Sequence, residues 1–179
     1  MKMIKESDLK ILFTKEKIQE EIAKLGQRLN EIYGEEELNL ICVLKGSVMF
    51  MTDLAKHLKM PVKMEFIRLS SYGSAFTSTG KVNAVDISLP DLNDKNVLII
   101  EDIIDTGHTA KFLVDFINLN FHTRTMRFCS LLDKKIKRQV DIDADYYCFE
   151  IDDKFLVGYG LDYDGYYRNI PYIGYVEVD

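Results

Sequence analysis

The chain has 179 residues, 47% of them hydrophobic and 29% charged, which is typical of one compact globular domain with a sizeable core. Its formal net charge of -6 argues against a general nucleic-acid-binding surface but allows a local basic pocket for a phosphorylated small molecule. No run approaches the roughly 20 apolar residues that span a bilayer, and the charged start lacks the pattern of a signal peptide. We therefore expect a single cytoplasmic domain over residues 1–179, without a membrane or nucleic-acid partner.

A first helix is predicted over residues 15–33, with Thr14 as its N-cap and Gly34 as its stop. Its apolar residues recur at spacings of three and four and therefore share one face: Ile18, Ile22, Leu25, Leu29 and Ile32. Residues 38–44 are predicted to form a strand that is buried on both faces, because nearly every position in them is apolar.

A second helix is predicted after Gly46, and the side chains expected to face the core are Val48, Met49, Phe50, Leu54 and Leu58. Residues 62–69 and 82–89 are predicted strands. Between them, residues 70–81 are rich in Ser, Thr and Gly and read as a loop. Connections of this length tend to be mobile lids or disordered, so we expect a mobile lid here.

The second half of the chain continues this alternation, with strands predicted at 96–100, 124–132, 146–151 and 155–157 and a helix at 110–120. Leu113, Phe116 and Ile117 share one face of this helix. Strands interleaved with helices predict an α/β fold with a largely parallel central sheet.

The three cysteines are Cys42, Cys129 and Cys148, and each lies in an apolar, strand-like run. No two of them have the spacing of metal ligands. We therefore expect buried thiols in a reducing compartment and not a disulfide framework.

The most informative segment runs from residue 96 to residue 109. An apolar strand ends in the adjacent carboxylates Glu101 and Asp102, and a third carboxylate, Asp105, follows in the loop. The loop continues as Thr106, Gly107, His108 and Thr109 and then opens a helix. Ligands of parallel α/β sheets bind beyond the carboxyl ends of the strands, so this loop lies where a binding site is expected.

The chemistry of this segment suits a phosphorylated sugar. Free N–H groups at the helix start, together with the hydroxyls of Thr106 and Thr109, form a site for a phosphate dianion, and Gly107 allows close backbone approach. Three carboxylates beside an anion would repel it unless a hydroxyl or a cation lies between them. A ribose diol and Mg²⁺ both meet this requirement, since Mg²⁺ is commonly held by one or two carboxylates plus substrate phosphates.

Residues 97–109 resemble the motif that binds phosphoribosyl pyrophosphate (PRPP) in type I phosphoribosyltransferases, and the Ile-Ile-Asp-Thr-Gly core is similar to the hypoxanthine-guanine branch. Further segments resemble that branch in the expected order: 44–46, 71–72, 130–134 and 153–163, followed by Arg168. The resemblance covers roughly residues 40–170. It implies the type I phosphoribosyltransferase fold, a mostly parallel sheet flanked by helices with a small hood formed by the terminal segments.

The resemblance implies that Glu101 and Asp102 hold the ribose hydroxyls, directly or through magnesium, and that the loop from Asp105 to Thr109 binds the 5′-phosphate. It also implies that the Asp105 carboxylate is the general base at purine N7, where a carboxylate at hydrogen-bond distance can accept the proton. Nearby carboxylates would favour a cation-like ribose, and magnesium would stabilise the leaving diphosphate. His108 stands at a variable position of the loop.

For the base, the resemblance implies that Lys134 donates to the exocyclic oxygen of a 6-oxopurine and so selects against a 6-amino base. Phe155 would stack on the purine, Ile103 belongs to the same purine site, and a backbone group around Leu156 would read the other edge. Leu156 stands where some relatives carry valine, which leaves the preference among oxopurines open.

The same resemblance assigns three residues to pyrophosphate: Lys45, Gly46 and Arg168. A structural ion pair is the alternative for Arg168. Asp162 is assigned to a second magnesium. Ser71 and Tyr72 would close over the site as part of the lid and exclude water that would otherwise hydrolyse PRPP.

Residues 133–138 form a charge run, and such runs are usually solvated faces. We accept that interpretation for Lys135, Lys137 and Arg138. Lys134 is assigned a function on family position alone.

The resulting hypothesis is a magnesium-dependent enzyme of purine salvage that makes IMP or GMP and pyrophosphate from PRPP and hypoxanthine or guanine, as a homodimer or homotetramer. One alternative is transfer to another base, xanthine or uracil. A second is a PRPP- or nucleotide-sensing regulator that binds RNA, against which the acidic charge and the intact Asp105 argue. A phosphorylation-receiver domain is a third, and the Thr-Gly-x-Thr loop argues against it.

Overall fold

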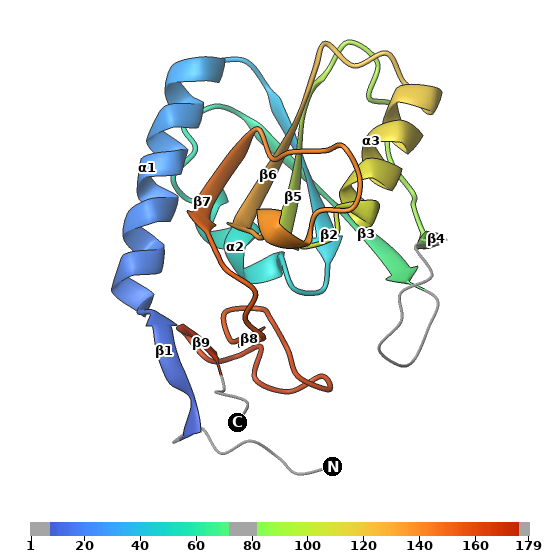
Figure 1. Cartoon of the computed structure of the whole chain (residues 1–179). Helices are drawn as coiled ribbons and strands as arrows, with labels where there is room; N and C mark the ends of the chain where they lie inside the picture. Colours follow the sequence, from blue (N-terminus) through green and yellow to red (C-terminus); the bar gives the residue numbers. More distant parts are fainter. Residues whose placement is uncertain (1–7, 72–81, 176–179) are drawn as a thin grey trace.

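A mixed sheet of six strands forms the centre of the protein in the computed structural model, which describes residues 8–71 and 82–175 (Figure 1). The strands lie in the order β4-β3-β2-β5-β6-β7. They span Leu38–Leu44 (β2), Val62–Ser71 (β3), Val82–Asp86 (β4), Asn96–Ile104 (β5), Thr125–Asp133 (β6) and Tyr146–Glu150 (β7). The five neighbouring strands β3, β2, β5, β6 and β7 run parallel to one another. The sixth strand, β4, pairs antiparallel with β3 at the edge of the sheet. The predicted α/β class with a mostly parallel sheet is therefore confirmed.

Helices cover both faces of this sheet. They are α1 (Lys15–Tyr33), α2 (Val48–Ala55) and α3 (His108–Asn120). Figure 1 shows the sheet between α1 and α3. Along β5, Leu98 and Ile100 belong to the core under α1 and α2, whereas Val97 and Ile99 belong to the core under α3. Successive side chains of a strand point to opposite faces, so a sheet covered on both sides has the near-continuous apolar runs seen in the sequence.

Helix α1 begins and ends where the sequence predicts. The Thr14 side chain accepts a hydrogen bond from the Lys17 backbone N–H (3.3 Å), and the helix ends at Gly34, whose φ is 59°. The predicted buried stripe is wrong at its end, where Ile32 is 50% exposed and Tyr33 is buried instead. The buried face also includes Gly26, which, at about 100° per residue, shifts the centre of this face toward Tyr33 and away from Ile32.

Helix α2 buries Phe50 and Leu54 as predicted. Met49 is 38% exposed, so the prediction that it faces the core is wrong. Met51 is buried in its place, because a turn of about 100° per residue rotates one methionine outward and the other inward. Leu58 lies beyond the end of the helix and is partly buried against the same core.

The first two residues of the predicted lid lie in a strand. Ser70 and Ser71 continue β3 and pair with β4 in antiparallel register. The rest of the predicted lid, residues 72–81 with Tyr72, lies outside the described residues. Strand β4 ends at Asp86, short of its predicted boundary.

Strand β5 continues to Ile104, past its predicted end at residue 100. Glu101 and Ile104 pair with Ser130 and Asp133 of β6. The two adjacent carboxylates therefore lie within the hydrogen-bonded ladder and not after it. Their backbone is held by a neighbouring strand, which fixes where their side chains point.

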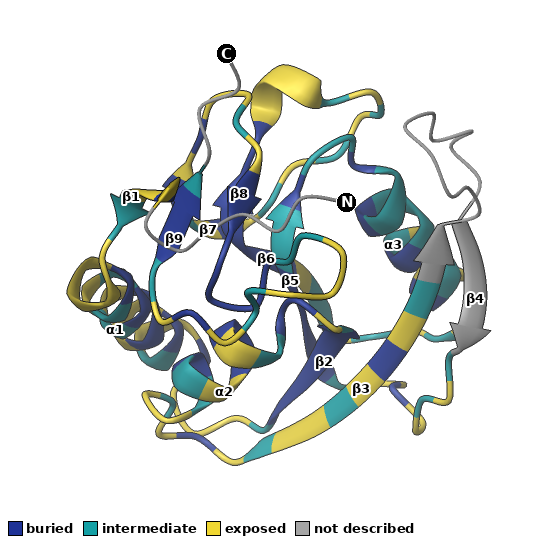
Figure 2. Ribbon diagram, turned by 90° about the horizontal axis from the view of Figure 1, so that it is seen from below, coloured by how far each residue is buried: buried dark blue, intermediate teal, exposed yellow. Residues whose placement is uncertain are grey.

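A second, antiparallel sheet forms the predicted hood. Its strands lie in the order β1-β9-β8 and span Lys10–Phe13 (β1), Leu156–Val157 (β8) and Ile173–Tyr175 (β9). Tyr175 pairs with Lys10 on one side and with Leu156 on the other. The hood lies below the main sheet in Figure 1, and Figure 2 shows it from beneath with β8 and β9 buried. The predicted hood of terminal segments is therefore confirmed, although β1 and β9 were not predicted individually.

The three cysteines are free thiols, with Cys42 and Cys129 buried and Cys148 half-buried. Their burial agrees with the expectation from the apolar strands that carry them. Within residues 8–71 and 82–175, no helix is long and apolar enough to cross a membrane.

Candidate functional site

Most of the predicted site residues lie at the carboxyl ends of β2, β5 and β6 or in the hood, whereas Ser71 ends β3 and Tyr72 lies outside the described residues. The loop after β5 leads into α3, whose first residue is His108, two residues earlier than predicted. Gly107 is the N-cap and has a φ of 88°, in the left-handed region that favours glycine. A side chain here would also meet Arg138 and Ile142, because a Cβ atom would lie 2.9 Å from each of them.

A cavity of about 80 Å³ lies at this loop and the start of α3. It is lined by Glu101, Ile103, Ile104, Asp105, Thr106, Gly107, Thr109 and Ala110. The lining therefore combines the predicted phosphate loop with the carboxyl end of β5. Free N–H groups at the start of α3 make this a position for an anion.

Glu101 and Asp102 are carboxylates placed at an energetic cost. Glu101 is only 8% exposed, and burial, followed by the charge of Asp102, raises its pKa well above the usual value. Burial likewise raises the pKa of Asp102 to about 6. Neither side chain forms an ion pair with any described residue, so both are available to a hydroxyl or a cation.

Gly46 brings the loop after β2 against the end of β5. A Cβ atom at this position would overlap the carboxylate of Asp102. On its other side, the carbonyl oxygen of Gly46 packs so closely on Gly160 that a side chain there would overlap it. Lys45 is exposed beside them, after a cis peptide bond from Leu44. Glycine is therefore required at both position 46 and position 160.

Arg168 comes to this cluster from the hood. Its Nη1 donates to the Gly160 carbonyl (2.6 Å), and its Nη2 pairs with Asp162 Oδ1 (2.6 Å). Both charges act on Asp102, with Arg168 lowering and Asp162 raising its pKa. The structure therefore brings Arg168, Asp162 and Asp102 together. It also contains the structural ion pair considered as the alternative for Arg168.

Lys134 is 6% exposed, unlike a residue of a solvated charge run. Its Nζ donates to the Lys154 carbonyl (3.1 Å) and pairs with Asp153 Oδ1 (3.1 Å). Phe155, which follows Lys154, is 51% exposed, and its ring meets Tyr163 edge-on with centroids 5.6 Å apart. The Lys134 ammonium is therefore bound to the two residues that directly precede the exposed ring of Phe155.

Two other predicted purine-site residues lie in strands. Leu156 begins β8 and is buried, and Ile103 is half-buried near the end of β5. Ile103 pairs with Leu132 of β6, two residues before Lys134. The backbone near Leu156 and the side chain of Ile103 are therefore held by sheet pairing.

Arg138 was predicted to be a surface residue, and that prediction is wrong. Its side chain is only 13% exposed, pairs with the buried Asp133 and donates to the Asp105 carbonyl (2.7 Å). Lys135 and Lys137 are 44% and 45% exposed, as expected of a solvated face. The sequence signal that separates Arg138 from its neighbours is weak, since it depends on Asp133 ending a buried strand.

The donor set suits magnesium shared with a substrate. The described part of the chain contains no cluster of three or more His, Cys, Asp or Glu that holds a metal ion by itself. Magnesium sites built from one or two carboxylates plus substrate phosphates need no such cluster. The buried Glu101 and the half-buried Asp102, neither with an ion-pair partner among the described residues, are residues of this kind.

Comparisons with known proteins agree with this geometry. Residues 8–164 match the family model for the phosphoribosyl transferase domain. A hypoxanthine-guanine phosphoribosyltransferase from Streptococcus thermophilus (strain CNRZ 1066) is 40% identical over 175 residues, which cover 98% of this chain and 97% of the relative. A relative of the same name from Bacillus subtilis (strain 168) has the same identity and coverage. The crystal structure of a hypoxanthine phosphoribosyltransferase from Staphylococcus aureus has a TM-score of 0.91 at 39% identity, covering 99% of this chain and 96% of that one.

Proposed function

The chain belongs to the phosphoribosyl transferase family, and we propose that it is an enzyme of purine salvage that transfers the 5-phosphoribosyl group of PRPP to hypoxanthine or guanine. The observation that carries this proposal is the state of Asp105. Its Oδ1 is buried and has no hydrogen-bond partner among the described residues, and it stands directly before the anion-binding loop. A general base needs such an unpaired carboxylate beside the reacting group.

The 5′-phosphate of PRPP is held by the start of α3. The N–H groups of the loop and the hydroxyls of Thr106 and Thr109 would bind its oxygens. Glu101 and Asp102 would accept hydrogen bonds from the ribose diol, directly or through the metal. The cavity at the end of β5 supports this arrangement, because its lining includes Glu101 together with Thr106, Gly107 and Thr109 of the loop.

In the reaction, a purine nitrogen forms a bond to the anomeric carbon of the ribose as the bond to diphosphate breaks. The proton lost from the purine at N7 passes to the Asp105 carboxylate. Positive charge that develops on the ribose is stabilised by the nearby carboxylates Glu101 and Asp102. The diphosphate leaves towards Lys45, the backbone at Gly46 and Arg168.

Glu101 and Asp102, with Asp162 on the hood, would hold Mg²⁺, which neutralises charge on the leaving diphosphate when bound. In this structure Arg168 already pairs with Asp162. Because this pair lies near Asp102, the Arg168 cation is available for the diphosphate and the Asp162 carboxylate for Mg²⁺ on the same side of the site.

The base would lie between Lys134 and Phe155. The Lys134 ammonium would donate to the 6-oxo group, in exchange for its present contact with Asp153. Phe155 has half of its surface free to stack on the ring, with Ile103 and the backbone at Leu156 completing the site. The 6-amino group of adenine is a hydrogen-bond donor, as is the Lys134 ammonium, so the two cannot bond to each other and adenine is disfavoured.

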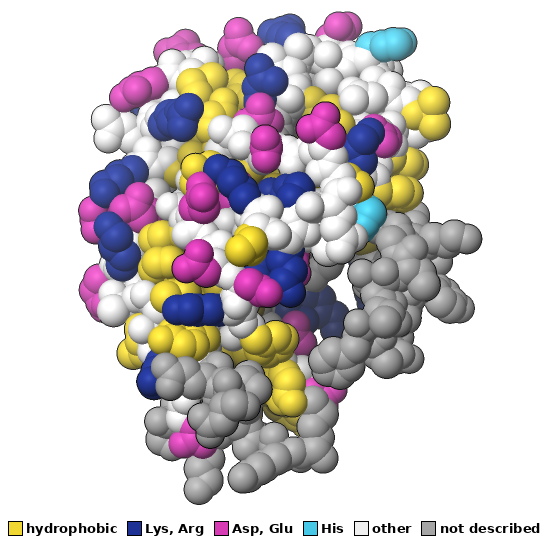
Figure 3. Space-filling view, in the orientation of Figure 1, with side chains coloured by type: hydrophobic (Ala, Val, Ile, Leu, Met, Phe, Trp, Pro, Cys, Tyr) yellow, Lys and Arg dark blue, Asp and Glu magenta, His cyan; other side chains and the backbone are white. Residues whose placement is uncertain are grey.

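The other readings receive less support. A regulator that binds RNA should present an extended basic face, yet Lys and Arg are interspersed with Asp and Glu on the face shown in Figure 3. A transferase for xanthine or uracil would use the same PRPP loop and is separated only by the base. We propose a homodimer or homotetramer in the cytoplasm, and light scattering of the purified protein tests the oligomeric state.

One assay decides among these functions. Purified protein, Mg²⁺ and PRPP are incubated with hypoxanthine, guanine, xanthine, adenine or uracil, and released pyrophosphate is measured. We expect release with hypoxanthine or guanine and little with adenine or uracil. If none of the five bases releases pyrophosphate, the enzyme function is wrong, and release confined to xanthine or uracil would support the alternative substrate.

A further inference from the structure

The loop that precedes α3 is held from outside the motif, by the segment that follows β6. The Lys134 N–H donates to the Ile104 carbonyl (2.9 Å), and Arg138 Nη1 donates to the Asp105 carbonyl (2.7 Å). The Gln139 N–H then donates to the Thr106 carbonyl (2.9 Å). Consecutive carbonyl groups of the loop are therefore each bound by one segment.

Two further contacts extend this support. Gln139 Oε1 lies 3.0 Å from His108 Nε2, at the first residue of α3. The Cδ atom of Arg138 packs against Gly107 so closely that a Cβ atom there would lie 2.9 Å away. The loop is thus held along its length, and Arg138 is the member that contacts both its backbone and its glycine.

Arg138 is fixed in turn by Asp133. Asp133 is fully buried, pairs with Ile104 in the ladder between β5 and β6, and accepts the Ile151 N–H at its carbonyl (3.0 Å). Its carboxylate pairs with Arg138 Nη2. A planar guanidinium keeps the direction of its donors, so a counter-charge built into the sheet sets where Nη1 points.

This arrangement keeps the guanidinium off the Asp105 carboxylate. Arg138 bonds the backbone oxygen of Asp105, while Oδ1 of the same residue has no partner among the described residues. An arginine paired with that carboxylate would compete for the position of the incoming proton. Because Asp133 occupies the guanidinium instead, the loop is anchored without neutralising its acidic side chain.

Stability alone does not account for the pair. Buried ion pairs are often no better for stability than well-packed apolar residues of similar size. Here Arg138 Nε and Asp133 Oδ2 also have no hydrogen-bond partner among the residues described, although a buried unsatisfied group is costly. The pair of Arg138 and Asp133 instead fixes the direction in which Nη1 donates to the Asp105 carbonyl.

We propose that Arg138, held by Asp133, is a positioning residue that sets the backbone of residues 105–107 and thereby the Asp105 carboxylate and the 5′-phosphate loop for transfer. The proposal rests on the function proposed above, because it assigns Arg138 a part in that reaction. The contacts themselves do not depend on the identity of the base.

The test uses the full chain with Arg138→Met, Arg138→Lys and, as a matched control, Arg124→Met, which removes an exposed arginine that pairs with Glu36. Hydrogen–deuterium exchange of peptides covering residues 104–109 and 15–33 is measured together with kcat and KM for PRPP. We expect faster exchange at 104–109 but not at 15–33 in both Arg138 variants, and a loss of kcat/KM on the order of 100-fold from a small displacement of reacting groups. Arg124→Met should match the wild type in both measurements.

Arg138→Lys keeps the charge but lacks the fork that reaches Asp133 and Asp105 together, so it should fold even where Arg138→Met does not. Unchanged exchange at 104–109 in a folded Arg138 variant overturns the proposal, as does faster exchange with unchanged kcat/KM in an active protein. If the wild type transfers no phosphoribosyl group at all, the proposed function fails separately, and the exchange data still decide whether Arg138 holds the loop.

Discussion

Gly46 lies directly against the carboxylate of Asp102, so the loop after β2 and the end of β5 meet with no side chain between them. The carbonyl oxygen of Gly46 packs in the same way on Gly160 of the hood. Two glycines thus allow three segments that are far apart in the sequence to share one small volume. The proposed pyrophosphate and ribose positions are set by this contact.

Gly46→Ala tests that contact. The new methyl group would overlap the Asp102 carboxylate, so either the loop or the carboxylate must move. We expect kcat/KM for PRPP to fall on the order of 100-fold, because displacements of about 1 Å at a reacting centre have effects of this size. Gly34→Ala is the control for loss of stability alone, since its positive φ strains any side chain but nothing lies within 4 Å of that position. An active Gly46→Ala enzyme would contradict the assigned role of the contact.

Asp105→Asn should separate catalysis from binding. Asparagine keeps the shape of the side chain and the backbone contact with Arg138, but it cannot accept the purine proton. We expect kcat to fall about 10²- to 10⁴-fold, the usual range for loss of a general base, with a much smaller change in the Kd for PRPP. Asp115→Asn, on the exposed side of α3, serves as the control. An equal loss of kcat and PRPP affinity would indicate a structural role instead.

Lys134→Met should affect the base and spare PRPP. A hydrogen bond from a charged donor is worth about 1.5–3 kcal/mol, so kcat/KM for hypoxanthine and guanine should fall about 10- to 100-fold while KM for PRPP stays similar. Lys135→Met is the neighbouring control, because Lys135 is 44% exposed and pairs with Glu150. If both variants behave alike, Lys134 has no special role in base recognition.

The raised pKa of Asp102 predicts how stability depends on pH without magnesium. Burial raises this pKa from 3.8 to about 6, so the folded state binds a proton that the unfolded state has lost. The contribution of Asp102 to stability therefore decreases as pH rises from about 4 through 6, and the penalty is complete above the folded pKa. Asp102→Asn removes this penalty.

The measurement is the Tm of magnesium-free wild type and Asp102→Asn between about pH 4.5 and 7, the window set by the linkage relation. Exposed carboxylates with a lowered pKa, such as Glu20 and Glu150, have the opposite pH dependence in both proteins, so the difference between them is the informative quantity. We expect the variant to gain Tm relative to the wild type as pH rises. A constant difference would show that Asp102 does not titrate as its burial predicts.

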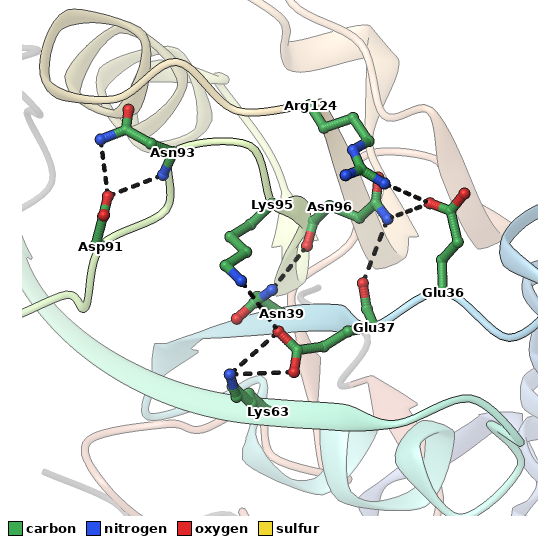
Figure 4. A network of polar contacts seen from close by, with 9 residues as sticks. All are labelled: Glu36, Glu37, Asn39, Lys63, Asp91, Asn93, Lys95, Asn96 and Arg124. Carbon is green, nitrogen blue, oxygen red and sulfur yellow. Dashed lines mark hydrogen bonds and ion pairs between the residues drawn. The ribbon is translucent and has the colours of Figure 1, made fainter.

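Asn96 is the first residue of β5, at the end of the strand opposite to the proposed site. Figure 4 shows its polar contacts. Its Nδ2 donates to Glu36 Oε2 (2.8 Å), its Oδ1 accepts from the Thr125 hydroxyl (3.0 Å), and its carbonyl accepts from Asn39 Nδ2 (3.2 Å). Asn96→Ala removes the hydrogen bonds to Glu36 and Thr125 but keeps the backbone contact with Asn39, and it should reduce the free energy of unfolding by about 1–3 kcal/mol, with kcat unchanged where the protein is folded. Chemical denaturation measures the loss, and Asn118→Ala on exposed α3 is the control.

Much of the site could be predicted because its chemistry is contiguous in the chain. Glu101, Asp102, Asp105 and the loop to Thr109 form one strand–loop–helix unit. Of these residues, Glu101, Asp105, Thr106, Gly107 and Thr109 line one cavity. Ile32 and Met49 were misplaced by a fraction of a helical turn, which periodicity resolves poorly at helix ends. The hood strands β1 and β9 were missed because they are short and pair with strands that lie elsewhere in the chain.

Arg138 shows the limit most clearly. In the sequence it is one cation in a charge run, and nothing local distinguishes it from Lys137. In the fold, the strand pairing between β5 and β6 buries Asp133, and the chain after β6 turns back so that Arg138 reaches the Asp105 carbonyl.

The sequence by itself determined the α/β order of elements, the caps of α1 and the strand–loop–helix unit that carries the proposed phosphate loop, because each depends on hydrogen bonds and periodicity within a few residues. Only the tertiary structure decided that Gly46 meets Asp102, that the two ends of the chain form one hood sheet, and that the Arg138 side chain is only 13% exposed. These contacts join residues far apart in the chain, and burial of a given side chain depends on the packing of every element around it.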